Sequence, residues 1–383
     1  MSARPGVALA LEVPLTFRGG INVILEELIR DLSDQFAFTL VSPDPPDVTR
    51  QYPNLAGHLP WNPAPVSRES SKDLAVALSD RDIQLVHFHL PGTYGFGMKL
   101  PGVSPFRFLA RAGIPSITSA HSVVGVLHGY CGPSKPLWFK LATLPVAWAG
   151  KVSALRLVRA EVAVSQHDAA ILRRWFSPWA ARKVRVIYHS RLRGAPVDRT
   201  KPRKKIILCI GHIAFRKGQH ILAQAFAKIA AAHPEWSLHF AGETVEPSCE
   251  ARIRESVAAL GDRVQFLGSR QDALQLMSEA EVFAQPSLQE ALGLALQEAL
   301  YASCACIGTT AGGIPELIQH NINGLLCPPN DVPALAAGLD RLLANPKLRD
   351  ELGRRGPEWI LSKDMTAESM VARHAALYRE FLP

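Results

Sequence analysis

The chain lacks any uninterrupted run of the roughly 18–20 apolar residues that a membrane-spanning helix needs. It also lacks the apolar core of a secretion signal, because Glu12 ends the short apolar stretch near the amino terminus. That stretch, residues 6–13, predicts a first β-strand instead. We therefore expect a cytoplasmic protein, and leave open a peripheral contact with the inner face of a membrane.

Cysteine is scarce, and its spacing argues against a structural metal. The six cysteines include no Cys-x-x-Cys pair. Cys304 and Cys306 are the closest couple, and two thiols do not complete the tetrahedral site that zinc prefers. The Asp80-Arg81-Asp82 triplet precedes a predicted strand, whereas a catalytic pair would follow one. His87 and His89 share one strand face without a further evident ligand. We expect buried free thiols in a reducing compartment and no required metal.

Acidic residues are fewer than basic ones. The 42 lysines and arginines exceed the 34 aspartates and glutamates, which gives a formal net charge of +8. This excess indicates an anionic partner, which could be a phosphorylated ligand, an acidic membrane surface or nucleic acid. Hydrophobic residues make up 48% of the chain, as in ordinary globular proteins. The 383 residues exceed the roughly 250–300 at which a single core stops growing, so two domains are expected.

Short apolar runs alternate with helical patterns in both halves of the chain. Such alternation predicts an α/β fold made of two doubly wound, Rossmann-like domains, each with a parallel sheet. Two such domains that face each other would form a central cleft at the carboxyl ends of their strands. The strand candidates are 6–13, 36–42, 83–90, 115–120, 162–165, 184–188, 205–211, 237–241, 264–267, 282–285, 305–309 and 324–327; helix candidates include 22–33, 70–78, 219–232, 250–260, 273–278, 294–301 and 332–343.

The predicted domain boundaries follow from a basic segment without apolar periodicity near the middle of the chain. Residues 1–190 form the amino-terminal domain, 191–204 the linker and 205–366 the carboxyl-terminal domain. Residues 367–383 form a last helix that we expect to pack back on the first domain. The linker is rich in arginine and lysine, but it lacks the interleaved aromatic residues or the motif that would favour nucleic-acid binding.

Two glutamates in the second domain, Glu290 and Glu298, stand eight residues apart. On one continuous helix they would point about 80° apart and would not converge. A turn at Gly293 would instead leave Glu290 in a loop and place Glu298 in the second turn of a helix. That helix start would offer N–H groups to a phosphate. The alternative is two solvent-facing glutamates on an amphipathic helix; we expect both to line an open cleft.

The segments around these glutamates carry a specific combination of motifs. In order and type they closely resemble the carboxyl-terminal domain of the family 4, or group 1, retaining glycosyltransferases of the GT-B fold. The resemblance extends over about residues 6–380. The matching motifs are Pro286-Ser287, Glu290, Gly293-Leu294, Glu298-Ala299, Gly312-Gly313-Ile314-Pro315-Glu316 and Asn323-Gly324-Leu325-Leu326.

Upstream, the segment from Gly211 to Gly218 follows a predicted strand and opens a helix. It resembles the phosphate loop of the family, and Lys217 takes the position of the lysine that binds the donor diphosphate. His212 replaces the family's usual arginine; Arg216 could supply the missing cation, or His212 could donate when protonated. The alternative for Arg216 and Lys217 is a solvated helix start. The spacing of the two glycines does not fit a dinucleotide-binding fingerprint.

The amino-terminal half resembles the family more weakly. Gly19 and Gly20 match a glycine loop that brings backbone near the donor phosphates, and His121 matches a histidine that faces the donor sugar. A core or surface histidine is the alternative for His121. His189 and Ser190 stand where the family usually has a Pro-Asn-Gly-Val-Asp segment. Ser303 and Ala305 replace a usual glycine and proline, which we interpret as variation in packing.

Residues 135–159 combine apolar and aromatic side chains, among them Trp138 and Trp148, with Lys151, Arg156 and Arg159. Aromatic residues interleaved with cations suit a membrane interface. A core helix would explain the apolar members equally well, and the sequence leaves both interpretations open. An interfacial site would suit a lipid-linked acceptor.

The resemblance implies a retaining glycosyltransferase that moves a sugar from a UDP- or GDP-linked donor to a hydroxyl of a glycan or lipid-linked acceptor, without metal or nucleic acid. Catalytic roles fall on Glu290, His121 and Lys217. A non-catalytic nucleotide-sugar-binding protein on a degenerate GT-B frame is the main alternative, and a phosphorylase or epimerase on the same fold is another. The donor-binding residues would be Gly19, Gly20, His212, Arg216, Lys217, Leu292, Gly293, Leu294 and Glu298.

Overall fold

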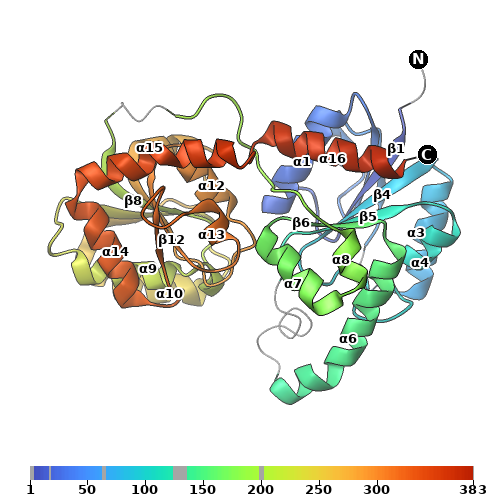
Figure 1. Cartoon of the computed structure of the whole chain (residues 1–383), viewed down its shortest axis with the longest axis horizontal. Coiled ribbons are helices and arrows are strands. Elements are labelled where there is room, and N and C mark those ends of the chain that lie inside the picture. The colour runs from blue at the N-terminus through green and yellow to red at the C-terminus, as the bar shows by residue number, and fades with distance from the viewer. Residues whose placement is uncertain (1–3, 17–18, 63–65, 124–135, 198–201, 383) are drawn as a thin grey trace. The chain divides into compact units, whose positions relative to one another are not determined.

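The backbone forms two compact units, each built on its own parallel sheet (Figure 1). The structure is a computed structural model, and it describes residues 4–16, 19–62, 66–123, 136–197 and 202–382. The first unit comprises Met1–Arg191 together with Ala367–Pro383, and the second comprises Leu192–Thr366. Arg18, which directly precedes the Gly19-Gly20 motif, and Lys135, which begins the aromatic and basic segment 135–159, lie outside the described residues.

The first unit holds a seven-stranded sheet with the strand order β3-β2-β1-β4-β5-β6-β7, in which neighbouring strands are parallel. Strand β1 is buried from Val7 to Leu11, as expected for a strand with helices on both faces of its sheet. The elements are β1 (Gly6–Leu11), α1 (Gly20–Leu32), β2 (Ala37–Ser42), α2 (Val48–Gln51), β3 (Gly57–Pro60), α3 (Arg68–Ser79), β4 (Ile83–Leu90), α4 (Phe106–Arg111), β5 (Ser116–Ala120), α6 (Leu137–Leu157), β6 (Ala160–Ala163), α7 (Gln166–Phe176), α8 (Trp179–Lys183), β7 (Val184–Val186) and α16 (Ala367–Phe381).

The last helix of the chain, α16, belongs to this first unit and lies beside α1 (Figure 1). Its Tyr378 is fully buried, and the ring meets the Phe36 ring edge-on with centroids 5.4 Å apart. The Tyr378 hydroxyl also lies 2.8 Å from Nδ1 of His87 on β4. The apolar stripe of α16 is therefore covered by the first unit, although the second unit precedes it in sequence.

The second unit holds a six-stranded parallel sheet with the order β10-β9-β8-β11-β12-β13. Its core is formed by apolar side chains of the strands and of the helices on both faces, such as Phe226 and Leu339. The elements are β8 (Lys204–Ile210), the 3-10 turn η1 (Phe215–Lys217), α9 (Gln219–Ile229), β9 (Ser237–Ala241), α10 (Pro247–Ser256), η2 (Ala258–Arg263), β10 (Val264–Phe266), α11 (Ala273–Glu279), β11 (Ala280–Gln285), α12 (Leu294–Tyr301), β12 (Ala305–Thr309), α13 (Ile314–Leu317), β13 (Leu325–Cys327), α14 (Val332–Ala344) and α15 (Pro346–Ser362).

Each sheet has a topological switch point, where the strand order reverses direction. In the first unit it lies between β1 and β4, and in the second between β8 and β11. Open α/β sheets bind ligands outside the carboxyl ends of the strands at such a point. The loops after β1, β4, β8 and β11 are therefore the positions where functional residues are expected.

Most predicted strands and helices agree with the structure within a few residues, but the predicted helix 250–260 is wrong in its second half. Helix α10 ends at Ser256, and a 3-10 segment follows in which Gly261 has φ +52°. Helix α15 was not predicted, although Asn345 caps it and Pro346 begins it, both helix-start signals. Gly356 and Pro357 in its interior break the helical sequence pattern, which is why the helix was missed. Glycine is required at position 356, because a Cβ there would lie 2.6 Å from the Leu300 carbonyl oxygen.

Within the described part of the chain, no helix combines the length and the apolar character that crossing a bilayer requires.

Candidate active site

The loop after β8 is shaped by glycine and held by side chains from neighbouring elements. Gly218 has φ +73°, and a Cβ there would lie 1.9 Å from the Pro286 carbonyl oxygen, so only glycine allows this loop to approach the loop after β11. Gln219 Nε2 donates to the His212 carbonyl oxygen at 2.9 Å. Glu246 accepts the backbone N–H of Phe215 at 3.1 Å. These contacts fix the path of the segment that carries Arg216 and Lys217.

The loop after β11 is joined to the first loop through backbone contacts. The N–H of Leu288 donates to the Arg216 carbonyl oxygen at 2.8 Å. From the other side, Thr309 Oγ1 donates to the Ser287 carbonyl oxygen at 2.6 Å. Gly312 passes so close under the loop that a Cβ there would lie 1.6 Å from the Glu290 carbonyl oxygen. The Gly-Gly motif at 312–313 therefore supports the backbone of Glu290.

The side chains of Lys217 and Glu290 meet at the switch point of the second sheet. Lys217 Nζ lies 2.7 Å from Oε2 of Glu290, and the two side chains are 18% and 11% exposed. Gln285 Nε2 and Ser287 Oγ also donate to Oε2, at 3.0 and 3.2 Å. These exposed fractions exclude the hypothesis of a solvated helix start for Lys217 and of a solvent-facing glutamate at position 290. Arg216, by contrast, is exposed.

Two opposing effects set the ionisation of Glu290. Burial by itself would raise the pKa of its carboxyl group, but the charge and hydrogen bond of Lys217 outweigh it, with help from Arg216 and Ser287. The pKa of Glu290 therefore lies below its ordinary value, and the group is a carboxylate at neutral pH. The site holds a fixed anion beside two cations, which suits a ligand with both hydroxyl groups and phosphates.

The geometry proposed for the two glutamates is confirmed in its backbone and wrong in one respect. Gly293 has φ +103°, and α12 begins at Leu294, so Glu290 precedes the helix and Glu298 lies in its second turn. Glu298, however, is buried at 4% exposure, whereas an open, solvent-exposed side chain was expected. Leu292 is also buried, at 3%. We attribute both to the apolar packing of α12, which buries most of this short helix in the core.

In the first unit, the segment between β1 and α1 is held from two sides. Asp44 accepts the N–H groups of Leu15 and Thr16 at 2.6 and 3.2 Å. Asn22 Nδ2 donates to the carbonyl oxygens of Pro14 and Leu15 at 2.8 and 3.0 Å. Gly19 caps α1 in extended backbone, and the helix begins at Gly20. The role of Asp44 could not be predicted from the sequence, because this residue lies between prolines and carries no periodic signal.

His121 lies at the carboxyl end of β5, within a group of five histidines of the first unit. Its Nε2 lies 3.0 Å from Nδ1 of His89, and its ring centroid is 4.8 Å from that of His189. The His89 ring is 3.9 Å from the His87 ring, and His374 of α16 lies 5.8 Å from His87. These five residues, His87, His89, His121, His189 and His374, are called the histidine cluster below. His189 belongs to the segment that departs from the family pattern at residues 189–190.

Burial lowers the pKa of all five histidines, and for four of them neighbouring histidines lower it further. For His374 the pKa falls to about 4. At neutral pH the cluster is therefore uncharged, and His121 can act as a hydrogen-bonding group but not as a cation. The sequence places His87 and His89 on one strand face, whereas the inclusion of His189 and His374 depends on tertiary contacts.

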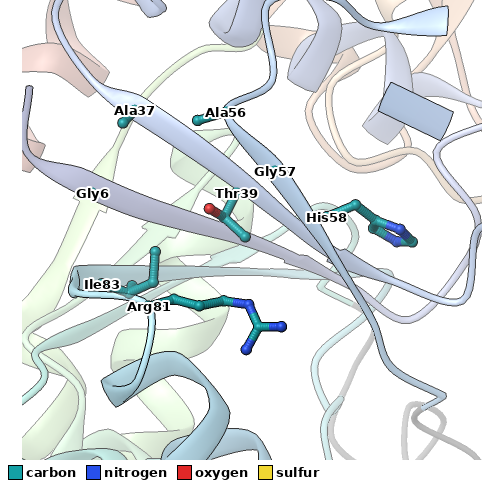
Figure 2. A pocket seen from close by; sticks show the side chains of 8 residues that line it. All are labelled: Gly6, Ala37, Thr39, Ala56, Gly57, His58, Arg81 and Ile83. Atoms are coloured by element: carbon teal, nitrogen blue, oxygen red, sulfur yellow. The ribbon is translucent and has the colours of Figure 1, made fainter. Parts of the chain in front are cut away.

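A separate hollow of about 330 Å³ lies at the amino ends of strands in the first sheet, away from the carboxyl ends that carry His121 (Figure 2). It is lined by residues that begin strands, including Gly6, Ala37 and Ile83, and by His58 and Arg81. Because ligands of open α/β sheets bind at the carboxyl ends of the strands, this hollow is not the candidate active site.

Metal ligands do not gather in the described residues, where no three His, Cys, Asp or Glu side chains are placed to share an ion. The candidate site of the second unit instead combines Lys217, Arg216 and the start of α12. The first N–H groups of a helix have no partner within it and carry its positive dipole end. Together these groups can bind a diphosphate, while the carboxylate of Glu290 can accept hydrogen bonds from hydroxyl groups.

Comparison with solved structures identifies the fold. An Anabaena HepE in complex with UDP and glucose matches with a TM-score of 0.76 and 18% identity, over 98% of this chain and 100% of the other. WaaG, a glycosyltransferase involved in lipopolysaccharide biosynthesis, matches with a TM-score of 0.71 and 16% identity, over 96% and 98% of the two chains. The predicted GT-B architecture of two Rossmann-like domains is thereby confirmed.

Curated relatives match over part of the chain. The N-acetyl-alpha-D-glucosaminyl L-malate synthase of Bacillus anthracis is 31% identical over 181 residues, which are 47% of this chain and 46% of the relative. A GDP-mannose-dependent mannosyltransferase of Corynebacterium glutamicum, which acts on a monoacylated phosphatidylinositol monomannoside, is 30% identical over 42% of this chain and 46% of the relative. The chain thus spans about half the length of these relatives.

Two family models match consecutive parts of the chain. The model described as Glycosyltransferase Family 4 matches residues 18–190, and the model described as Glycosyl transferases group 1 matches residues 196–359. The boundary between them falls in the basic segment that joins the two units. With one of its halves matched by each model, the chain belongs to the group 1, family 4 glycosyltransferases.

Proposed function

We propose that this protein is a retaining glycosyltransferase of glycoconjugate biosynthesis, which transfers a sugar from a nucleotide-diphosphate sugar to an acceptor hydroxyl. The observation that carries the proposal is the Lys217–Glu290 pair, fixed at the switch point beside the start of α12. Family membership supports the reaction class, and the UDP and glucose in the HepE structure support the class of donor.

The difficult step is departure of the nucleotide diphosphate, because negative charge develops as the glycosidic bond breaks. Preorganised cations and N–H groups stabilise such charge best. We assign this task to Lys217, Arg216 and the N–H groups of Gly293 and Leu294. We assign to Glu290 the hydroxyl groups of the donor sugar, which its carboxylate would orient. Retention, with the leaving phosphate helping to take the acceptor proton, follows from the family.

The roles of the other predicted residues rest on the resemblance. His212 replaces the usual arginine, and its carbonyl oxygen is used to hold the loop through Gln219. For Glu298 we propose contact with the ribose, and for Gly19, Gly20 and His121 a role in donor binding. The acceptor is proposed to be a glycan or a lipid-linked molecule, in line with the phosphatidylinositol-linked substrate named for the mannosyltransferase relative. We place the protein in the cytoplasm, where the thiols of the five described cysteines, all buried, would stay reduced.

The proposal predicts that Lys217→Ala weakens binding of a nucleoside diphosphate roughly 10- to 150-fold while nucleoside binding changes little. The basis is the loss of one charge-assisted hydrogen bond, about 1.5–3 kcal/mol. Titration calorimetry with UDP, GDP and the matching nucleosides measures this, after a thermal-shift panel of UDP, GDP, ADP and dTDP has identified the base. Lys228→Ala, an exposed position on α9, is the matched control. Equal diphosphate affinity for both variants would contradict the assignment of Lys217.

A second prediction is that turnover persists in EDTA. The phosphate-facing charges of the proposed site come from Lys217, Arg216 and the start of α12, so no divalent ion is needed to neutralise the leaving group. Initial rates of donor consumption, with and without chelator, provide the measurement. Loss of turnover that added magnesium or manganese restores would overturn this expectation. Slow release of sugar to water in the same assay would also separate a transferase from a non-catalytic binder.

A further inference from the structure

The segment formed by α6, α7 and α8 has an unusual separation of charge. Residues 136–186 contain nine lysines and arginines but only two acidic residues, Glu161 and Asp168. Both acids are buried, at 0% and 1% exposure. Glu161 pairs with the buried Lys151 at 2.6 Å, and Asp168 accepts the N–H of Val123. Residues 136–186, all of which the structure describes, therefore contain exposed cations but no exposed acidic side chain of their own.

The exposed cations are distributed over the three helices and the adjoining strand ends. Some are used within the protein: Arg185 lies 3.8 Å from Glu380, and the guanidinium of Arg156 lies 4.8 Å over the Trp179 ring. The half-buried Lys183 donates to three carbonyl oxygens at the end of α6. Arg174 on α7 and Arg182 on α8 are both exposed, and their charges are directed toward solvent or a partner.

The first turns of α6 expose large apolar side chains. Trp138 is 70% exposed, Leu137 64% and Leu141 53%. These positions lie on one side of the helix, because residues three and four apart are neighbours on its surface. Val146 is also exposed, at 43%, but it lies on another side of the helix. In Figure 1 this end of α6 extends away from the sheet, beyond α7 and α8.

Tryptophan joins the apolar end to the cationic part. Trp148 of α6 donates its indole N–H to the Trp175 carbonyl oxygen on α7, and its ring centroid lies 5.8 Å from that of Trp179 on α8. Trp175 is itself 41% exposed beside Arg174. Four of the seven tryptophans of the chain thus lie on these three helices. Amphipathic rings of this kind are favoured at the boundary between water and hydrocarbon.

We propose that the exposed side chains of α6–α8, namely Leu137, Trp138, Leu141, Arg174, Trp175 and Arg182, dock the protein on an anionic lipid surface. The apolar residues of α6 enter the head-group boundary, and the arginines meet the lipid phosphates. The charge pattern favours a lipid surface over a second copy of this chain, because a second copy would bring the same unbalanced cations to the interface. This proposal rests on the proposed function in one respect: docking on a membrane would bring the enzyme to a lipid-linked acceptor.

Flotation with vesicles tests this without any need for activity. The full chain should float with vesicles of phosphatidylcholine and phosphatidylglycerol in equal parts, and binding should fall as salt is raised. Arg174→Gln with Arg182→Gln should weaken binding about 25-fold, since each cation near an anionic surface contributes about 1 kcal/mol. Trp138→Ser with Leu141→Ser should weaken it at least about tenfold through lost apolar burial.

Matched controls come from exposed positions on the second unit. Arg354→Gln with Arg355→Gln on α15 removes two exposed cations, and Leu274→Ser on α11 removes an exposed leucine of 48% exposure. Both controls should float as the parent does. All variants should keep the parent's nucleotide-diphosphate affinity, so a failed flotation result is distinguishable from a failed glycosyltransferase assignment.

Three outcomes would overturn the inference. One is equal flotation of the parent with vesicles of phosphatidylcholine alone, because the cations would then have no role. Another is equal weakening in the surface variants and in their controls. The third is a doubled mass of the parent in light scattering that the Trp138 and Leu141 substitutions abolish, because the apolar surface would then be an interface between two copies.

Discussion

Replacing Glu290 by glutamine is expected to lower kcat by a factor on the order of 10² to 10³, with little change in nucleotide-diphosphate affinity. Glutamine keeps the size of the side chain and can still bond to Ser287 and Gln285. It removes the negative charge beside the sugar carbon, where positive charge develops in the transition state. An interaction felt mainly in the transition state lowers kcat and kcat/KM together.

The ion pair with Lys217 leads to a second expected result for this variant, an effect on diphosphate affinity. Glu290 and a bound diphosphate would compete for the same ammonium group, which lies 2.7 Å from the carboxylate. Glu290→Gln removes this competitor, so the affinity for UDP or GDP should stay constant or rise, in contrast to Lys217→Ala. Steady-state kinetics with calorimetry on the same preparations would measure both quantities.

Glu298→Gln should behave differently from Glu290→Gln. A contact with the ribose acts alike in the ground state and the transition state, so its loss should raise the donor KM and leave kcat nearly unchanged. Because Glu298 is buried, thermal unfolding must show that the variant remains folded. Glu358→Gln, at an exposed position on α15, controls for the loss of one carboxylate. Parent-like kcat and KM in both site variants would remove the strongest support for the proposed function.

Acidification should strongly destabilise the first unit, and it should do so through the histidine cluster. Unfolded histidines have pKa values near 6.5, whereas burial lowers the pKa of all five in the folded unit. Below about pH 6.5 the unfolded chain therefore binds more protons than the folded one, and the free energy of unfolding falls as pH falls. The loss continues toward the folded pKa values, which for His374 is about 4.

The expected magnitude is large compared with the stability of a domain. One histidine of this kind removes about 1.4 kcal/mol per pH unit within its window. Five acting together would remove several kcal/mol per pH unit, against a total of about 5–15 kcal/mol for a typical protein. Cooperative loss of structure in the first unit is thus expected between about pH 5 and pH 4, where many proteins without such a cluster remain folded.

Urea unfolding at pH 7, 6 and 5 measures the pH slope, and hydrogen exchange in peptides from β4 and α16 assigns it to the first unit. His374→Leu should reduce the slope by about 1.4 kcal/mol per pH unit, whatever its effect on stability at pH 7. If the His374→Leu variant keeps the slope of the parent, the acid sensitivity has another origin.

The fold class and the backbone of the candidate site could be predicted from the amino-acid sequence. Alternating apolar runs indicated two parallel sheets, because strands covered on both faces must be apolar throughout. Gly293 predicted the start of α12 at Leu294, since a left-handed φ ends one segment and allows a new helix to begin. The motifs identified Gly218 and Gly312. The sequence did not show that the carbonyl oxygens of Pro286 and Glu290 lie too close to these positions for any side chain.

Which side chains meet could not be predicted from the sequence and became apparent in the folded chain. Lys217 and Glu290 are 73 residues apart, and they become an ion pair because β8 and β11 are neighbours in the second sheet. Gln285 and Ser287 join them, and burial with Lys217 then sets the charge of Glu290. No local pattern predicts such long-range pairing, since strand order is decided by packing of the whole domain.

The full histidine cluster could not be predicted from the sequence either. The sequence placed His87 and His89 on one face of a strand through the two-residue period of β-structure. His374 joins them from α16, which lies almost 300 residues later and folds back on the first unit. Likewise, the sequence left residues 135–159 as either a core or an interfacial helix. Burial supports the core interpretation for the later part of α6, and contact of its first turns with a membrane stays a proposal. The later part of α6 is buried around Lys151 and Leu155, whereas its first turns are open to solvent because no described element packs over Trp138 there.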